Sequence, residues 1–217
     1  MCFSATASFT ASAGLALVGG MTARLARNSR ESLLAGLPFL FSVQQMIEGM
    51  LWILITRSGP DALQQHLTTL YIIFVGVAWP VLSPLSLYLI EPLRQRRNYL
   101  AGLIFVGCSI AACTLYMLLH YTFYSQATHQ CIVYHNDAPI GLWTFPIYVL
   151  ATCAGFFISS LERSAYLGIA LLASFFVAYY FYALDLASVW CFLAAILSSL
   201  IYVHFRFPVV QRQFETS

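Results

Sequence analysis

Arginine falls in every second gap between seven long apolar stretches, and this spacing constrains the fold more than any other feature of the chain. Positive charge gathers on the cytoplasmic side of membrane segments, so the alternation indicates both a membrane protein and its orientation. We therefore predict an all-α bundle of seven transmembrane helices, with the N-terminus outside and the C-terminus in the cytoplasm. The opposite side carries Arg57 alone, and the predicted cytoplasmic side carries Arg24, Arg27, Arg30, Arg94, Arg96, Arg97, Arg163, Arg206 and Arg212.

The composition supports this class of protein. Hydrophobic residues make up 60 % of the chain and charged residues 8 %, whereas soluble domains carry about 25 % charged residues. Seven helices of about 20 residues use about 140 positions, which leaves room for loops but not for a second domain. We therefore predict a single domain, residues 1–217, with spans at about 4–23, 32–56, 65–90, 99–121, 141–160, 164–184 and 187–206.

The first predicted span is unusually rich in small and polar residues. Its positive charges follow it, so it does not have the pattern of a cleaved signal peptide. Polar and small residues alternate from Ser4 to Ala13, but an isolated strand cannot satisfy its backbone in lipid. We expect a helix in close contact with others through small side chains, either interior or wedged in a groove.

The third predicted span contains Pro80 and Pro84. Each proline removes a backbone donor and bends a helix. The bend either opens space near a binding site or serves packing alone, and the sequence leaves both readings open.

Glu48 is the only acid well inside a predicted span, in the outer half of the membrane. A carboxyl group at such depth is costly and therefore indicates function. Gln44 and Trp52 share its helical face, and Gln45 borders that face. The alternative is structural: a protonated glutamate hydrogen-bonded to glutamine that holds helices together.

Other polar or aromatic groups are expected to converge on the same outer level. The predicted pocket therefore consists of Gln44, Gln45, Trp52, His66, Trp79, Asp185, Trp190 and Cys191, with Glu48 as a catalytic acid or base. Cys2 is a second catalytic candidate, because removal of Met1 would leave a thiol beside a free amine, as a nucleophile or a metal chelator. With Met1 retained, Cys2 is instead a buried thiol or a disulfide partner.

The longest predicted loop contains His129, Cys131 and His135, which point to one side if the segment is extended. Imidazole and thiolate are good ligands for zinc or copper, although this spacing matches no established metal signature. A disulfide from Cys131 to Cys191 or Cys2 is the alternative, because the outer face would be oxidising. Histidines that only form hydrogen bonds are a third reading.

Four stretches together resemble a family of bacterial multi-pass membrane proteins of unknown function. The resemblance implies a bacterial inner-membrane location and no particular activity. A weaker comparison is with alkaline ceramidases, whose seventh-span His-x-x-x-His pair is absent here, and a retinal protein is excluded because the chain has no lysine. The stretches are Met1-Cys-Phe-Ser-Ala, Gln44-Gln-x-x-Glu-Gly-x-x-Trp52, Trp79-Pro-x-x-x-Pro84 and Ser188-Val-Trp-Cys-Phe192.

The sequence is compatible with three functions. The first is a membrane enzyme with an outward-facing pocket, metal-dependent or cysteine-based, that acts on a lipid or a small molecule. The alternative is a non-enzymatic sensor or carrier in which Glu48 is a protonation switch, and the third is a scaffold. Membrane lipids are the expected partners, and the net charge of +2 gives no indication of nucleic-acid binding. The oligomeric state is left open.

Overall fold

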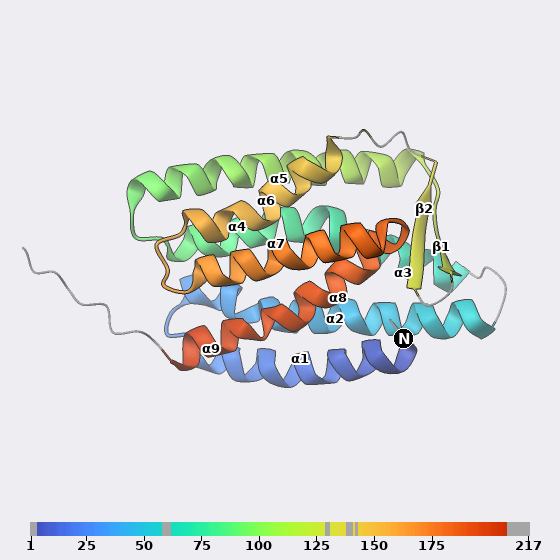
Figure 1. Cartoon of the computed structure of the whole chain (residues 1–217), viewed down its shortest axis with the longest axis horizontal. Coiled ribbons are helices and arrows are strands. Elements are labelled where there is room, and N and C mark those ends of the chain that lie inside the picture. The colour runs from blue at the N-terminus through green and yellow to red at the C-terminus, as the bar shows by residue number, and fades with distance from the viewer. Residues whose placement is uncertain (1–3, 58–61, 129–130, 138–140, 142, 208–217) are drawn as a thin grey trace, which may run out of the picture.

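A computed structural model describes residues 4–57, 62–128, 131–137, 141 and 143–207. Its helices lie side by side in an elongated bundle, with a small two-stranded sheet across one end (Figure 1). The helices are α1 (Ala5–Leu25), α2 (Ser29–Arg57), α3 (Ala62–Ile73), α4 (Trp79–Ile90), α5 (Arg94–His120), α6 (Thr144–Ile158), α7 (Ser164–Phe181), α8 (Leu186–Ser198) and α9 (Leu200–Arg206). A π-helical turn, η1 (Phe74–Ala78), joins α3 to α4, and a 3-10 turn, η2 (Ala183–Asp185), precedes α8.

Each of the seven predicted spans coincides with a helical segment, so the mainly helical prediction is confirmed. Among the described residues, five helical segments are long and apolar enough to cross a membrane: 29–57, 62–90, 94–120, 164–181 and 183–206. Helix α6 is apolar but shorter. The count of seven spans and their orientation stay predictions.

The close packing expected of the first span is present between α1 and α2. Ser12 donates a hydrogen bond to the Ser42 carbonyl at 2.9 Å. A Cβ atom on Gly19 would lie 2.6 Å from the backbone nitrogen of Phe39, so only glycine allows this approach. Of the two expected positions, interior or wedged in a groove, the interior one is wrong. Helix α1 lies at the edge of the bundle (Figure 1), and its far face is open, with Leu17 70 % exposed.

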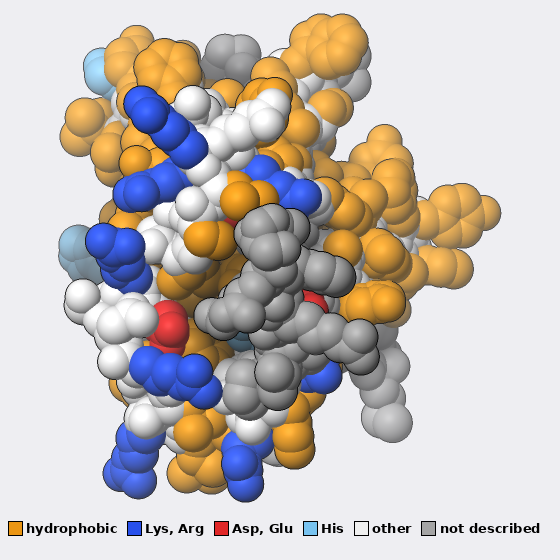
Figure 2. Space-filling view, turned by 90° about the vertical axis from the view of Figure 1, so that its left-hand side faces the viewer, with side chains coloured by type: hydrophobic (Ala, Val, Ile, Leu, Met, Phe, Trp, Pro, Cys, Tyr) orange, Lys and Arg blue, Asp and Glu red, His pale blue; other side chains and the backbone are white. Residues whose placement is uncertain are grey.

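One end of the bundle carries most of the described arginines, and we call it the arginine end. The α1–α2, α4–α5 and α6–α7 connections all lie there, together with the end of α9 (Figure 1). Figure 2 looks onto this end and shows basic side chains distributed across it. The predicted orientation requires this arrangement. Its described members are Arg24, Arg27, Arg30, Arg94, Arg96, Arg97, Arg163 and Arg206.

Glu91 ties two connections together at the arginine end. Its carboxylate, in a residue only 3 % exposed, accepts hydrogen bonds from Ser160 N (2.7 Å), Ser160 Oγ (2.6 Å), Ser159 Oγ (3.1 Å) and Leu93 N (3.2 Å). Burial raises the pKa of Glu91, but the hydrogen bonds from Ser160, Leu93 and Ser159 together outweigh burial, and the net pKa is lowered.

This lowered pKa predicts an acid-sensitive contribution to stability. Because the folded pKa lies below the unfolded value of about 4.3, the contribution is present above that value and is lost as the pH falls through the folded pKa. Glu91→Gln should cost about 1.5–3 kcal/mol at neutral pH, the usual worth of hydrogen bonds to a charged group. The variant's free energy of unfolding in detergent should also depend less on pH below about pH 4.3. The exposed Glu162→Gln is the control, and parallel profiles for wild type and Glu91→Gln would contradict the prediction.

The end opposite the arginines is covered by an antiparallel hairpin, β1 (Phe123–Thr128) and β2 (Cys131–Asn136). Side chains from α3 hold β1: Gln64 donates to Ser125 O at 2.8 Å and Gln65 to Phe123 O at 2.6 Å. Ile132 on β2 is completely buried. The segment predicted as a long loop is therefore, over its described part, a docked cap on the bundle.

The prolines of the third span have a specific backbone effect. Pro80 has no N–H, so it cannot donate the α-helical hydrogen bond that the Gly76 carbonyl would otherwise accept. The chain forms a π-helical turn just before it, in which Trp79 N bonds to Phe74 O. Pro84 in the same way leaves the Pro80 carbonyl without an α-helical donor. The predicted irregularity is thus present as a π-helical turn followed by a regular α4.

Candidate functional site

A group of polar side chains lies buried where α2, α3, α4, α8 and β2 meet, towards the hairpin end of the bundle. We call it the polar cluster. Gln44 and Gln45 are completely buried and Glu48 is 1 % exposed. Burial of so many polar groups in an apolar bundle is costly, and such clusters indicate function or helix specificity. Its members are Gln44, Gln45, Glu48, Tyr71, Trp79, Tyr134, Ser188 and Cys191.

Glu48 bridges two helices that are 140 residues apart in the sequence. Ser188 of α8 donates a short hydrogen bond to Oε1 of the Glu48 carboxyl, and Gln45 Nε2 of α2 donates to Oε2 at 3.1 Å. Within the described part of the chain both partners are neutral, and no arginine or histidine forms an ion pair with Glu48. The position of Gln45 three residues before Glu48 follows from helical geometry, since such residues are neighbours on a helix.

Trp79 links α4 to the same cluster. Its indole N–H donates to Gln44 Oε1 at 2.7 Å, and its ring stacks on Phe41 with centroids 3.8 Å apart. The π-helical turn sets the direction of Trp79, because Trp79 is the first residue after it. Trp79 therefore holds the side chain of Gln44, while Glu48, one helical turn further along α2, is hydrogen-bonded to Ser188 of α8.

Two tyrosines close the cluster on the side of the hairpin. Tyr71 of α3 stacks on Tyr134 of β2 with centroids 4.4 Å apart, and its hydroxyl donates to Ala187 O at 3.4 Å. Burial, followed by the neighbouring Glu48 and Cys191, raises the pKa of Tyr134 well above its ordinary value. Its phenol therefore stays neutral. Cys191 lies beside Gln44 and Tyr71.

Two buried polar atoms in or next to this cluster have no hydrogen-bond partner in the described structure. They are Gln45 Oε1 and Trp52 Nε1. Unpaired buried donors and acceptors are uncommon in folded proteins. They provide both donors and acceptors around a carboxyl group, which suits a proton-exchanging site.

The structure brings together only part of the predicted pocket. Gln44, Gln45, Glu48, Trp79 and Cys191 lie in the polar cluster, and Trp52 packs next to it against Leu51 and Ile132. His66 is exposed on α3, and Asp185 is half-buried before α8. Trp190 faces away, packing on Tyr148 and Phe175 and donating to Leu171 O at 3.3 Å.

The predicted metal site finds no support. Among the described residues, no group of three His, Cys, Asp or Glu side chains is arranged to hold a metal ion. His135 stacks on Tyr124, whereas Cys131 is buried against Cys153 and Phe175. Cys191 is a free thiol, so a Cys131–Cys191 disulfide, one of the alternatives to the metal site, is not formed. Cys2 and His129 lie outside the described residues.

Ser188, Tyr71 and Tyr134 belong to the cluster but were absent from the predicted site. Ser188 precedes Cys191 by three residues, so the two share a helical face, and this spacing was the available signal. For the two tyrosines no local pattern pointed to the site, because only the tertiary fold brings α3 and β2 to α2.

Comparison with known proteins gives a family and no activity. No curated protein and no solved structure matches the chain. The weaker likeness to alkaline ceramidases is therefore unsupported. One family model, described as "Family of unknown function (DUF6629)", matches residues 1–213. Since this match covers nearly the whole sequence, the chain belongs to the DUF6629 family.

Proposed function

We propose that this is a seven-span protein of the bacterial inner membrane, N-terminus outside, that responds to protons through Glu48. One observation carries the proposal: Glu48 is buried and joins α2 to α8 through Ser188, and its hydrogen-bond partners among the described residues are neutral. A carboxylate inside a membrane without a nearby cation is costly, and binding a proton removes that cost. The charge of Glu48 then alters the contact between the two helices.

The partners of Glu48 can serve both of its charge states. Gln45 Nε2 donates to Glu48, while Gln45 Oε1 has no partner. A half-turn of the Gln45 amide exchanges donor and acceptor, so that Oε1 receives the proton of a neutral Glu48. The Ser188 hydroxyl also donates or accepts. A protonation switch needs two satisfied arrangements of this kind.

Infrared difference spectroscopy tests this proposal. We expect a carboxylic-acid C=O band in the purified protein that persists at neutral pH, where ordinary glutamates with a pKa of about 4.3 are ionised. Glu48→Gln should remove the band, and Ser188→Ala should shift it because a hydrogen bond to the carboxyl is lost. Glu162→Gln, at an exposed position, is the matched control. A neutral-pH band unchanged in Glu48→Gln would refute the proposal.

Proteoliposomes with a pH gradient separate a carrier from a sensor. Proton flux that Glu48→Gln abolishes would identify a carrier. A Glu48 band that titrates in the absence of flux would identify a sensor.

An enzyme acting on a lipid or small molecule is the second candidate. The favouring observation is that Ser188 bonds to Glu48 while Cys191, on the same face of α8, lines an apolar cavity of about 70 Å³. A carboxyl that accepts a proton from a hydroxyl or thiol activates a nucleophile. The test is incubation with a long-chain acyl thioester: transfer of the acyl group to Cys191, with release of the probe's thiol and loss in Cys191→Ser, would favour the enzyme.

A further inference from the structure

A second, larger cavity lies at the arginine end, away from the polar cluster. Helix α7 packs on α8 through Phe175, Ala178 and Val189, and the two segments then separate towards the arginine end (Figure 1). The space between α7 and α9 is a cavity of about 260 Å³, with Leu87 and Phe156 among its lining residues. Figure 2 shows hydrophobic side chains in a hollow of this end face, with basic side chains around it.

A smaller cavity lies next to this one, towards the middle of the bundle. It is the cavity of about 70 Å³ that Cys191 lines, and it shares three wall residues with the larger one: Phe156, Leu167 and Ile201. The smaller cavity extends to Trp79 and Cys191. The two cavities therefore lie next to each other along the bundle, with these three side chains between them. An alkyl chain that displaces those side chains would reach from the arginine end into the smaller cavity, and an elongated apolar group fits this arrangement better than a compact ligand.

The mouth of the larger cavity carries positive charge. Arg163 is exposed there and donates from Nη1 to Phe207 O at 3.1 Å, and His204 lies beside it in the lining. Two acids, Glu162 and Glu31, also face His204. Glu31, however, already accepts bonds from Arg27 N (2.8 Å) and Asn28 Nδ2 (3.2 Å). Among the described residues of this end, eight arginines outnumber three glutamates, so an anion is favoured at the mouth.

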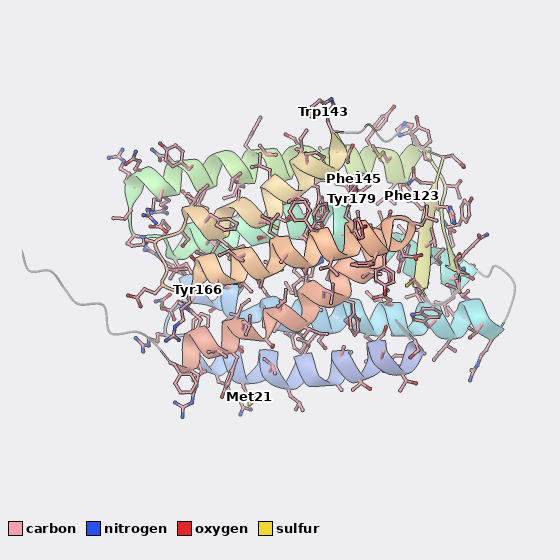
Figure 3. The ribbon with its side chains drawn as sticks, viewed as in Figure 1. Met21, Phe123, Trp143, Phe145, Tyr166 and Tyr179 are labelled. Carbon is pink, nitrogen blue, oxygen red and sulfur yellow. The ribbon has the colours of Figure 1, made fainter. Side chains whose placement is uncertain are left out.

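The cavity also opens sideways. Leu200, Val203 and Tyr166 belong to its lining and are 44 %, 40 % and 74 % exposed. Tyr166 lies near the start of α7, at the arginine end, whereas Tyr179 lies near the other end of that helix (Figure 3). Exposed apolar side chains on a membrane-spanning helix face lipid, so an occupant can enter from the bilayer.

The geometry points to a binding site for one anionic phospholipid, with one acyl chain in the cavity and its phosphate at Arg163. The second chain stays in the bilayer beside Leu200 and Val203. Arginine suits this role because its guanidinium donates paired hydrogen bonds to phosphate oxygens. The phosphate-binding part of the site is independent of the Glu48 proposal, whereas the smaller cavity is lined by Trp79 and Cys191 of the polar cluster.

Native mass spectrometry of the detergent-purified protein tests the site. We expect phosphatidylglycerol to bind more tightly than phosphatidylcholine. Arg163→Gln should lower the affinity for phosphatidylglycerol about tenfold, as expected for the loss of one charge-assisted hydrogen bond. Arg24→Gln, an exposed arginine of the same end outside the cavity lining, should leave binding unchanged. Equal binding of the two lipids, or equal losses in both variants, would overturn the site.

Two further measurements address the acyl chain. Leu167→Trp should fill the junction of the cavities and lower binding of both lipids while the variant keeps its melting temperature. Wild-type protein should be photolabelled near Trp79 or Cys191 by phosphatidylglycerol with a diazirine at the chain terminus. Labelling confined to the outer surface of the helices, or binding of free palmitate in place of phosphatidylglycerol, would refute the proposed occupant.

Discussion

Replacing Trp79 with alanine is expected to lower the free energy of unfolding by about 3–5 kcal/mol, the usual cost of truncating a buried tryptophan. Trp79 is 6 % exposed and stacks on Phe41, and its ring is tilted against that of Phe74 with centroids 6.1 Å apart. Its indole N–H donates to Gln44 Oε1 at 2.7 Å. Its loss creates a void beside an existing cavity and leaves the Gln44 oxygen unpaired. Reversible unfolding in mixed detergent micelles measures the change.

Two variants separate the causes of this effect. Trp79→Phe keeps an aromatic ring but removes the indole donor, so it should cost about 1–3 kcal/mol. Trp143→Ala, at a tryptophan that is 77 % exposed just before α6 on the outside of the bundle (Figure 3), should change stability by less than about 0.5 kcal/mol. A Trp79→Ala loss no larger than that of Trp143→Ala would show that the ring does not anchor α4 to α2.

Gly107→Ala is expected to be the most disruptive single-methyl change, lowering stability by about 1–3 kcal/mol through overpacking. A Cβ atom at this position of α5 would lie 2.0 Å from the Pro80 carbonyl oxygen and 2.7 Å from its carbon. Backbone atoms cannot yield as a flexible side chain does, so α4 and α5 must separate. The contact exists because Pro84 leaves that carbonyl without a helical donor and glycine allows α5 to approach it.

Gly102→Ala on the same helix is the matched control. A Cβ atom there meets nothing within 4 Å, so the change should be neutral or stabilising by up to about 1 kcal/mol, the helix-propensity gain of alanine over glycine. The comparison uses the same substitution on the same helix. Equal melting temperatures for the two variants would contradict the close approach of α4 and α5.

Much of the helical framework could be predicted from the sequence because lipid imposes simple rules on it. Apolar stretches of about 20 residues must be helical in lipid. The predicted 187–206 and 164–184 correspond to helical residues 186–206 and 164–181, which agree closely. The expectation of an interior first helix failed because α1 packs through one face, mainly on α2 and also on α8 and α9, while its other face is open.

The site was partly predictable for a related reason. Glu48 and Gln44 were identified because polar groups are rare and conspicuous within an apolar span. Ser188 was missed because serine is common in membrane helices, and only the fold brings it to Glu48. The cavity at the arginine end could not be predicted from the sequence. Its lining residues, such as Leu167 and Ile201, are the same residue types that face lipid, and only the fold shows that α7 and α9 diverge.

The π-helical turn η1 rotates the directions of all later side chains of the third helical segment about the helix axis. Tyr71 and Trp79 are eight residues apart, which in an unbroken α-helix would place them about 80° apart around the axis. The extra residue accommodated in the turn reduces the rotation by about 100°, so both rings face the polar cluster. A single helical wheel drawn through residues 62–90 would assign one half of this span to the wrong side. The wheel has to be restarted at Trp79.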